Sequence, residues 1–257
     1  MERTPQKIRF SQPIQLPKRM VVDGDRLYVT LGWNAPISVI NAGTGELIEV
    51  LSETNCADEI LLSDGKLILS TYEDAVRPLD FVGIENSSRV KKKIQVIDLS
   101  SSRMLWESNW LDGLNARLDA VAPQTHLELT VRSGKVFAIT KDSIVCFSLQ
   151  NGERLWAIPR PEHPIHRMNL GVNMGDNCTV LSDDDRLYVA QPVGRILNNF
   201  HTIPCDLYAY DAQTGEQLWM LQEKIGSFAW GIHADVFLID GKLWSHEHIP
   251  AEMKGAY

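Results

Sequence analysis

The stretch LYAYDAQTGEQLW, residues 207–219, has an alternating apolar segment, a polar turn and a second segment that ends in Trp219. Asp211 opens the turn and Gly215 closes it. The same arrangement occurs three more times: VINAGTGEL at 39–47, VIDLSSSRMLW at 96–106 and CFSLQNGERLW at 146–156. Internal repetition of this kind indicates a fold built from one repeated unit.

A tryptophan holds a fixed place in this motif. Trp106, Trp156 and Trp219 each follow the first turn residue by the same interval, whereas the first copy has Glu49 at that place. A tryptophan at the end of a strand can cover a large apolar area between neighbouring sheets, and its N–H needs only one partner. We therefore assign a structural role to these tryptophans and to the glycines of the turns, which are Gly45, Gly152 and Gly215.

A second motif precedes the first and reads as a tight hairpin. An apolar segment leads into a short turn, which is followed by an alternating strand. The turns and strands are DGDRLYV (23–29), DGKLIL (64–69), SGKVFA (133–138), DDRLYV (184–189) and DGKLW (240–244). Asp-Gly between two apolar runs is a strong hairpin signal, because glycine readily adopts the positive φ of the turn.

Together the two motifs give a unit of four antiparallel strands, which is one blade of a β-propeller. We expect an N-terminal extension over residues 1–17, and then four complete repeats with a partial fifth. The approximate repeats are 18–50, 58–107, 126–157, 178–220 and 233–248. A β-sandwich does not explain why one strand order returns four times, and the chain lacks sustained helical spacing.

This repeat resembles the quinoprotein alcohol dehydrogenase-like repeat, also called the pyrroloquinoline quinone-like repeat. The resemblance extends over residues 18–245, nearly the whole chain. Residues 29–36, 173–177 and 235–241 are similar to a non-catalytic bacterial branch in which the propeller is part of a larger multidomain protein. The resemblance implies a ring of about seven or eight blades, so we expect this chain to be an incomplete ring, a fragment or half of an assembly.

The resemblance does not carry the cofactor with it. Dehydrogenases of the family bind the quinone against a disulfide between adjacent cysteines, beside a calcium ion. The four cysteines here stand at 56, 146, 178 and 205, so none are adjacent and there is no CxxC. We expect free thiols, no cofactor, no metal and no catalytic residue. Other members of the family, such as the outer-membrane assembly lipoprotein, use the propeller to bind proteins.

Composition excludes some classes of function. The net charge is −8 and no apolar run is long enough to cross a bilayer. An acidic chain without a basic face is a poor ligand for nucleic acid. Its one basic run, residues 91–93, is interpreted as a solvated loop or as charges that protect the edge of a strand. Without a secretory signal the chain as written is expected in the cytoplasm, or outside it if a longer precursor exists.

Several loop residues are weak candidates for a site. Asp176 and Asn177 offer oxygens for a hard cation, but a turn is the better interpretation. His246 and His248 would share one face of a strand as two metal ligands do, yet they lack a third. Candidate contacts for a ligand or partner lie in other loops, at Trp33, Asn34, Asn173 and His166. For the loop that contains Trp33 and Asn34, packing against the neighbouring blade is the preferred alternative to such a contact.

The leading hypothesis is therefore a non-catalytic interaction or scaffold propeller. Its partner would be another protein or an adjacent domain of the same polypeptide, and oligomerisation would complete or cap the ring. Two alternatives remain open. One is a fragment of a pyrroloquinoline quinone-dependent dehydrogenase, and the other is a sensor of a small ligand or sugar. The fold does not choose among them.

Overall fold

The structure is a computed structural model that describes residues 20–32, 34–73, 91–115, 125–161, 178–192, 202–228 and 236–245. Every regular element within these residues is a β-strand. No helix in this part of the chain has the length and apolar character needed to span a membrane.

Four sheets share one strand order, in which each strand pairs antiparallel with the next along the chain. Blade 1 contains β1 (Met20–Asp23), β2 (Arg26–Thr30), β3 (Ile37–Asn41) and β4 (Leu47–Leu51). Blade 2 contains β5 (Ala57–Ser63), β6 (Lys66–Tyr72), β7 (Lys91–Asp98) and β8 (Arg103–Glu107). Blade 3 contains β12 (Glu128–Arg132), β13 (Lys135–Ile139), β14 (Ser143–Ser148) and β15 (Arg154–Pro159). Blade 4 contains β16 (Thr179–Ser182), β17 (Arg186–Pro192), β18 (Thr202–Asp211) and β19 (Gln217–Phe228).

A fifth unit is present as a hairpin of two strands, β20 (Val236–Ile239) and β21 (Lys242–Ser245). The shorter strand β9 (Leu111–Asp112) adds to blade 2 beside β7, and β10 (Leu114–Asn115) pairs with β11 (Thr125–His126). The predicted architecture, four blades and part of a fifth, is confirmed.

Three of the tight turns, those of blades 2 and 3 and of the β20–β21 hairpin, have the backbone that an Asp-Gly or Ser-Gly sequence predicts. In blade 2, Asp64 and Gly65 have φ of 49° and 67°. Two consecutive residues with positive φ define a type I′ turn, whose twist matches that of the flanking strands. Glycine adopts this conformation without strain and aspartate tolerates it. The local sequence therefore fixes the register of the first two strands of the blade.

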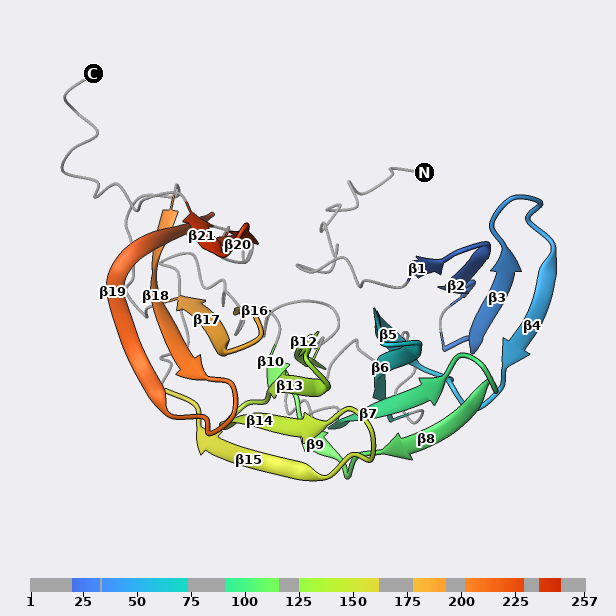
Figure 1. Ribbon diagram of the computed structural model, residues 1–257, viewed down its shortest axis with the longest axis horizontal. Helices are drawn as coiled ribbons and strands as arrows, with labels where there is room; N and C mark the ends of the chain where they lie inside the picture. Colours follow the sequence, from blue (N-terminus) through green and yellow to red (C-terminus); the bar gives the residue numbers. More distant parts are fainter. Residues whose placement is uncertain are drawn as a thin grey trace, which may run out of the picture.

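The blades lie side by side along an arc (Figure 1). Strands β1, β5, β12, β16 and β20 line the inner side of the arc, and each contacts the next. The outermost strands β4, β8, β15 and β19 form its convex side. Blade 1 and the β20–β21 hairpin stand at the two ends, so the described residues form an open arc rather than a closed ring.

The hydrophobic core is divided among the junctions between blades. One cluster of buried side chains joins blades 1 and 2, a second joins blades 2 and 3, and a third joins blades 3 and 4. A fourth joins blade 4 to the β20–β21 hairpin. Because each blade buries its two faces against two neighbours, a blade at an end of the arc has one face without a neighbour among the described residues.

Candidate functional site: the blade junctions and the ends of the arc

A β-bulge in each outermost strand determines which way the tryptophans point. In blade 2, Val96 pairs with Trp106 and Ile97 with Met104, so one residue between them is left out of the pairing. The same irregularity occurs in the other three blades. The bulged residues are Ile48, Leu105, Leu155 and Leu218. Side chains alternate along a strand, and one extra residue reverses that alternation.

The bulge lets one strand serve two junctions. Met104 packs in the cluster shared with blade 1, whereas Trp106, two residues later, packs in the cluster shared with blade 3. Without the bulge both side chains would lie on the same face of the sheet.

The junction between blades 2 and 3 is closed by Trp106. Its indole N–H donates a hydrogen bond of 2.9 Å to the carbonyl of Leu149 in the turn of blade 3. The ring lies on Gly152, where a methyl group would be 2.6 Å from the Cδ2 and Cε3 atoms of Trp106. Gly152 also has φ of 72°. Glycine is therefore required here both by the backbone and by the ring that covers it.

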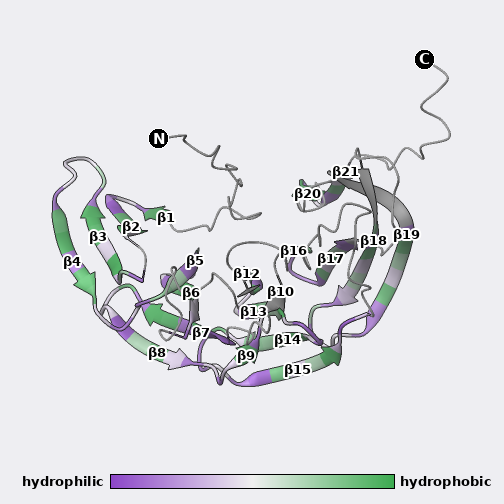
Figure 2. Cartoon of the chain, turned by 180° about the vertical axis from the view of Figure 1, so that it is seen from behind, coloured by the Kyte–Doolittle hydropathy of each residue, from purple (hydrophilic) through white to green (hydrophobic). Residues whose placement is uncertain are grey.

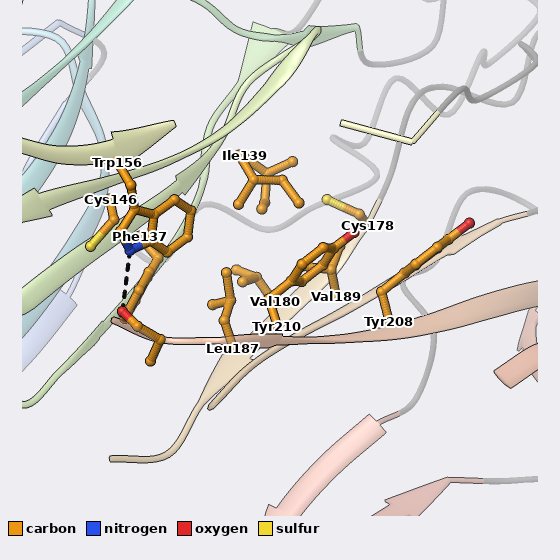
Figure 3. Close-up of a cluster of buried hydrophobic side chains, with 12 residues drawn as sticks. Phe137, Ile139, Cys146, Trp156, Cys178, Val180, Leu187, Val189, Tyr208 and Tyr210 are labelled. Carbon is orange, nitrogen blue, oxygen red and sulfur yellow. Dashed lines mark hydrogen bonds between the residues drawn. The ribbon is translucent and has the colours of Figure 1, made fainter. Parts of the chain in front are cut away.

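Trp156 closes the next junction in the same way (Figure 3). Its indole N–H donates to the carbonyl of Ala212 at 3.3 Å, and its ring lies against Gly215. Phe137 packs beside it with ring centroids 5.9 Å apart. Both tryptophans are only 9% exposed. At these two junctions the tryptophan covers the area between the blades, and its N–H has one partner.

The junction between blades 1 and 2 is built differently. Glu49 occupies the tryptophan position and accepts a hydrogen bond of 2.8 Å from the Ser102 hydroxyl. Ser102 has φ of 55° and takes the place of the turn glycine. A guanidinium nitrogen of Arg26 lies 3.8 Å from the same carboxylate oxygen of Glu49. At this junction a hydrogen bond replaces the aromatic contact.

A groove of about 380 Å³ lies at the same junction. Its walls come from β4 and its following loop and from the turn and outer strand of blade 2, and they include Glu49, Glu53, Ser102 and Arg103. Apolar side chains of Leu51, Ile97 and Met104 also line it. The carboxylate is smaller than an indole, so Glu49 fills less of the space at this junction than a tryptophan would.

At the ends of the arc the tryptophan–glycine pair is split. Trp219 is 37% exposed and contacts the ring of Tyr188 at 6.0 Å. Within the described ranges no acceptor faces its indole N–H. Gly45, the corresponding turn residue of blade 1, has φ of 77° and no atom within 4 Å of the position of a Cβ. In the described part of the chain, one end thus has a tryptophan without a turn beside it, and the other has a turn without a tryptophan on it.

The face of blade 1 that points away from blade 2 is apolar and has no neighbouring blade among the described residues. A row of paired residues crosses its four strands: Val22, Leu27, Ile40 and Leu47. The equivalent row of blade 2 is Leu62, Leu67, Ile97 and Met104, and it packs against blade 1. In blade 1 Val22 and Leu47 are 56% and 60% exposed. Figure 2 shows the hydrophobic segments of β3 and β4 at this end of the arc.

The other end presents two aromatic residues. Phe237 and Trp244 are paired across the β20–β21 hairpin and are 55% and 56% exposed. Their neighbours Leu238 and Leu243 point the opposite way and pack against blade 4. Alternation along the strands therefore directs Phe237 and Trp244 to the face that looks away from blade 4.

A buried polar cluster lies where blade 2 meets the loop of blade 1. Lys92 is 2% exposed, forms an ion pair with Asp58, and has its ammonium 4.9 Å from the centre of the Tyr72 ring. The Tyr72 hydroxyl donates to Asn34. The expectation that residues 91–93 form a solvated run is wrong for Lys92, because an acid more than 30 residues away in the sequence pairs with it inside the fold.

The other two lysines of the run are closer to the expectation. Lys91 is exposed. Lys93 is partly buried, pairs with Glu107 at 3.0 Å and lies 4.6 Å from the centre of the Trp110 ring.

Burial also controls the ionisation of a thiol. All four cysteines are buried, and none of them is in a disulfide bond. Removal from water raises the pKa of the Cys146 thiol to about 12, against which nearby Lys135 acts only weakly. A thiol with this pKa is protonated near neutral pH and is a poor nucleophile.

The structure describes only one of the candidate contact residues named from the sequence. Asn34 lies in the loop between β2 and β3 with φ of 57°, and its side-chain oxygen accepts the Tyr72 hydroxyl. It therefore joins blade 1 to blade 2, as the packing alternative expects. The other candidates lie outside the described residues: Trp33, His166, Asn173, Asp176, Asn177, His246 and His248. In the described ranges no group of three or more His, Cys, Asp or Glu side chains is placed to hold a metal.

Comparison with protein-family models gives no match, and comparison with curated protein sequences gives none either. Solved structures do match. BamB from Moraxella catarrhalis aligns with a TM-score of 0.53 and 12% identity, over 92% of this chain and 60% of BamB. At this identity the likeness shows the fold, a β-propeller, and the chain spans about 60% of the length of that neighbour.

Two alcohol-oxidising enzymes are also similar, with lower scores. The quinohemoprotein alcohol dehydrogenase ADHIIG from Pseudomonas putida HK5 has a TM-score of 0.45 and 15% identity, over 91% of this chain and 39% of that enzyme. A europium-containing methanol dehydrogenase has a TM-score of 0.47 and 11% identity, over 87% and 45%.

Proposed function

We propose that this chain is a non-catalytic β-propeller module that binds other protein surfaces through the two ends of its arc. The observation that carries the proposal is the pair of uncovered blade faces. Each has apolar residues at the positions that bury one blade against the next elsewhere in the chain. At these ends, however, Val22, Leu47, Phe237 and Trp244 are more than half exposed. Exposed apolar patches of this kind mark interaction sites in soluble proteins.

The chemistry of these faces supports a protein or an adjacent domain as the partner. They are sheet faces of aliphatic and aromatic side chains, with Val22 and Leu47 at one end and Phe237 and Trp244 at the other. The apolar face of a sheet packs against other protein elements. Aromatic side chains that are half exposed in a free protein are also typical of the centres of protein interfaces.

Photo-crosslinking in the native cell tests the proposal. A photoreactive amino acid is placed at Val22 or at Trp244, with Leu155 as the control. Leu155 is also an exposed apolar residue, but it lies on the outer strand of blade 3, away from both ends. We expect crosslinked species from the two end positions and none above background from the control. Crosslinks from neither end, or equal yields at all three positions, would contradict the proposal.

A second measurement separates this function from catalysis. The full chain is mixed with pyrroloquinoline quinone, calcium and an artificial electron acceptor, and alcohols and sugars are offered as substrates. We expect no dye reduction above a control without protein. Dye reduction that requires both quinone and protein would contradict the proposal and show that the chain is a dehydrogenase.

A further inference from the structure

We infer that the two ends of the arc bind each other between copies of this chain. In this contact, Phe237 and Trp244 of one copy pack on Val22 and Leu27 of the next. The inference rests on the proposed function and names the partner of the end faces as a second copy of the chain.

The contact has a template inside the chain, at the junction between blades 2 and 3. There Leu61 and Ile68, paired across the first hairpin of blade 2, face the following blade. Val131 and Val136, paired across the first hairpin of blade 3, face the preceding one. All four belong to one hydrophobic cluster, so the inner hairpins of consecutive blades are joined by aliphatic contact.

The free ends carry the two halves of that template. Phe237 and Trp244 hold the positions in β20 and β21 that Leu61 and Ile68 hold in β5 and β6, as counted from the turn of each hairpin. Val22 and Leu27 hold the positions in β1 and β2 that Val131 and Val136 hold in β12 and β13. The β20–β21 face of one copy therefore matches the β1–β2 face of another copy, and neither face matches itself.

The shape of the chain favours contact between copies. In Figure 1 the β1–β2 hairpin and the β20–β21 hairpin stand at opposite ends of the arc. Among the described residues, neither of these two end faces has a neighbouring blade. A head-to-tail contact uses two different surfaces, so it produces closed rings when the rotation between copies permits closure and longer arrays when it does not.

The contact uses the inner half of each end only. In the complete blades the third and fourth strands fill the outer half, and in the described part of the fifth unit only β20 and β21 are present. Trp219 and the turn at Gly45 lie on that outer half and take no part in the contact that we infer. The inner aromatic pair is expected to contribute most of the affinity, as large buried aromatics do in other interfaces.

Two single substitutions, and then their mixture, test the inference. Val22→Lys removes one surface and Trp244→Lys the other; both side chains are more than half exposed, so the fold is expected to persist. Leu155→Lys is the matched control. Sedimentation velocity of the purified full chain is expected to show concentration-dependent association. Each end variant should weaken it at least about 30-fold, a hot-spot effect, and the control should leave it unchanged.

The mixture is the decisive arm. Each end variant keeps one intact surface, so an equimolar mixture of Val22→Lys and Trp244→Lys should form a one-to-one complex that neither variant forms alone. Recovery in the mixture also shows that both variants are folded. Failure of the mixture to associate, a monomeric wild type at about 100 μM, where a standard interface is normally formed, or equal weakening by the control would overturn the inference.

The outcome is distinguishable from failure of the proposed function. If the purified chain stays monomeric while Val22 and Trp244 still crosslink to a different protein in cells, the proposed binding function is supported and the inferred self-association is wrong. If neither association nor crosslinking occurs, both are wrong.

Discussion

Glu49 accepts a hydrogen bond from Ser102 at the junction where the repeat would otherwise place a tryptophan on a glycine. The two positions differ together from the pattern of the other blades. A methyl group on Gly152 would overlap Trp106, so a side chain at the turn and an indole opposite it exclude each other. Because Ser102 has a Cβ and Glu49 is narrow enough to accommodate it, this pair is a second way to close a junction.

Replacing both members should be more favourable than replacing either one. Glu49→Trp alone places an indole against the Cβ of Ser102, whereas Glu49→Trp with Ser102→Gly restores the pair seen at the other junctions. We expect a double-mutant cycle in urea to give a favourable coupling free energy of about 1–2 kcal/mol. A coupling of zero would show that the two residues do not share the junction.

Gly152 should tolerate alanine far less well than Gly45. Both have positive φ, which strains an alanine by about 1–2 kcal/mol. Only at Gly152 does the new methyl group also meet a tryptophan ring, and overpacking adds about 1–3 kcal/mol. We therefore expect Gly152→Ala to lower the free energy of unfolding by about 3 kcal/mol and Gly45→Ala by about 1 kcal/mol. Equal losses of unfolding free energy in the two variants would mean that the Trp106 ring moves aside at no energetic cost.

Trp156→Phe should destabilise the chain more than Trp219→Phe. The first removes a buried indole and leaves the carbonyl of Ala212 without its donor, a loss of about 2 kcal/mol. Trp219 is more exposed and its N–H has no acceptor among the described residues, so its replacement should lower the free energy of unfolding by under about 1 kcal/mol. Thermal unfolding followed by circular dichroism measures both, and the reverse order would contradict this account of the junctions.

Lys92 should be more costly to remove alone than together with its partner. Lys92→Met leaves the Asp58 carboxylate without its cation in a largely buried site, and breaking such a pair costs about 3 kcal/mol or more. Lys92→Met with Asp58→Asn removes both charges, so most of that loss in unfolding free energy should be recovered. If the double variant is no more stable than the single one, the ion pair does not determine stability there.

Cys146 should make the fold sensitive to alkali. Burial raises the pKa of the folded thiol to about 12, so as the pH rises from about 9 the unfolded chain loses this proton first. Ionisation then favours the unfolded state, and stability declines between about pH 9 and 12. Cys146→Ala should show a shallower alkaline decline than wild type. At pH 8 the native thiol should resist alkylation until urea unfolds the chain, and rapid native labelling would contradict this.

The parts of the fold that were predicted from the sequence are those with local causes. Asp64 and Gly65 produce a hairpin through their own backbone preferences, and the regular position of Trp156 and Trp219 reveals the repeat directly. The need of an indole for one acceptor is likewise a property of the residue itself. Such features depend on neighbouring residues, so no knowledge of the tertiary packing is required.

The features that were missed depend on contacts between distant parts of the chain. Glu49 and Ser102 are 53 residues apart and Lys92 and Asp58 are 34 apart, and no local rule pairs them. The bulge at Leu105 is invisible in the sequence because it exists only in the pairing of β7 with β8. The first departure did leave a trace, since Glu49 was the one exception to the tryptophan pattern. A side chain that breaks the tryptophan pattern should direct attention to the turn of the next unit, where its partner lies.

Because of the bulge, the number of residues between the turn and the tryptophan decides which face of the blade the tryptophan lies on. Deleting Leu155 would remove only one residue at the junction between blades 3 and 4. It would nevertheless turn the Trp156 side chain away from blade 4 and toward blade 2. Single-residue insertions or deletions between the turn and the tryptophan should therefore be rejected during evolution, while far longer insertions in the loops between strands are accepted. The number of residues between the turn and the tryptophan is therefore fixed, whereas the lengths of the loops between strands can vary.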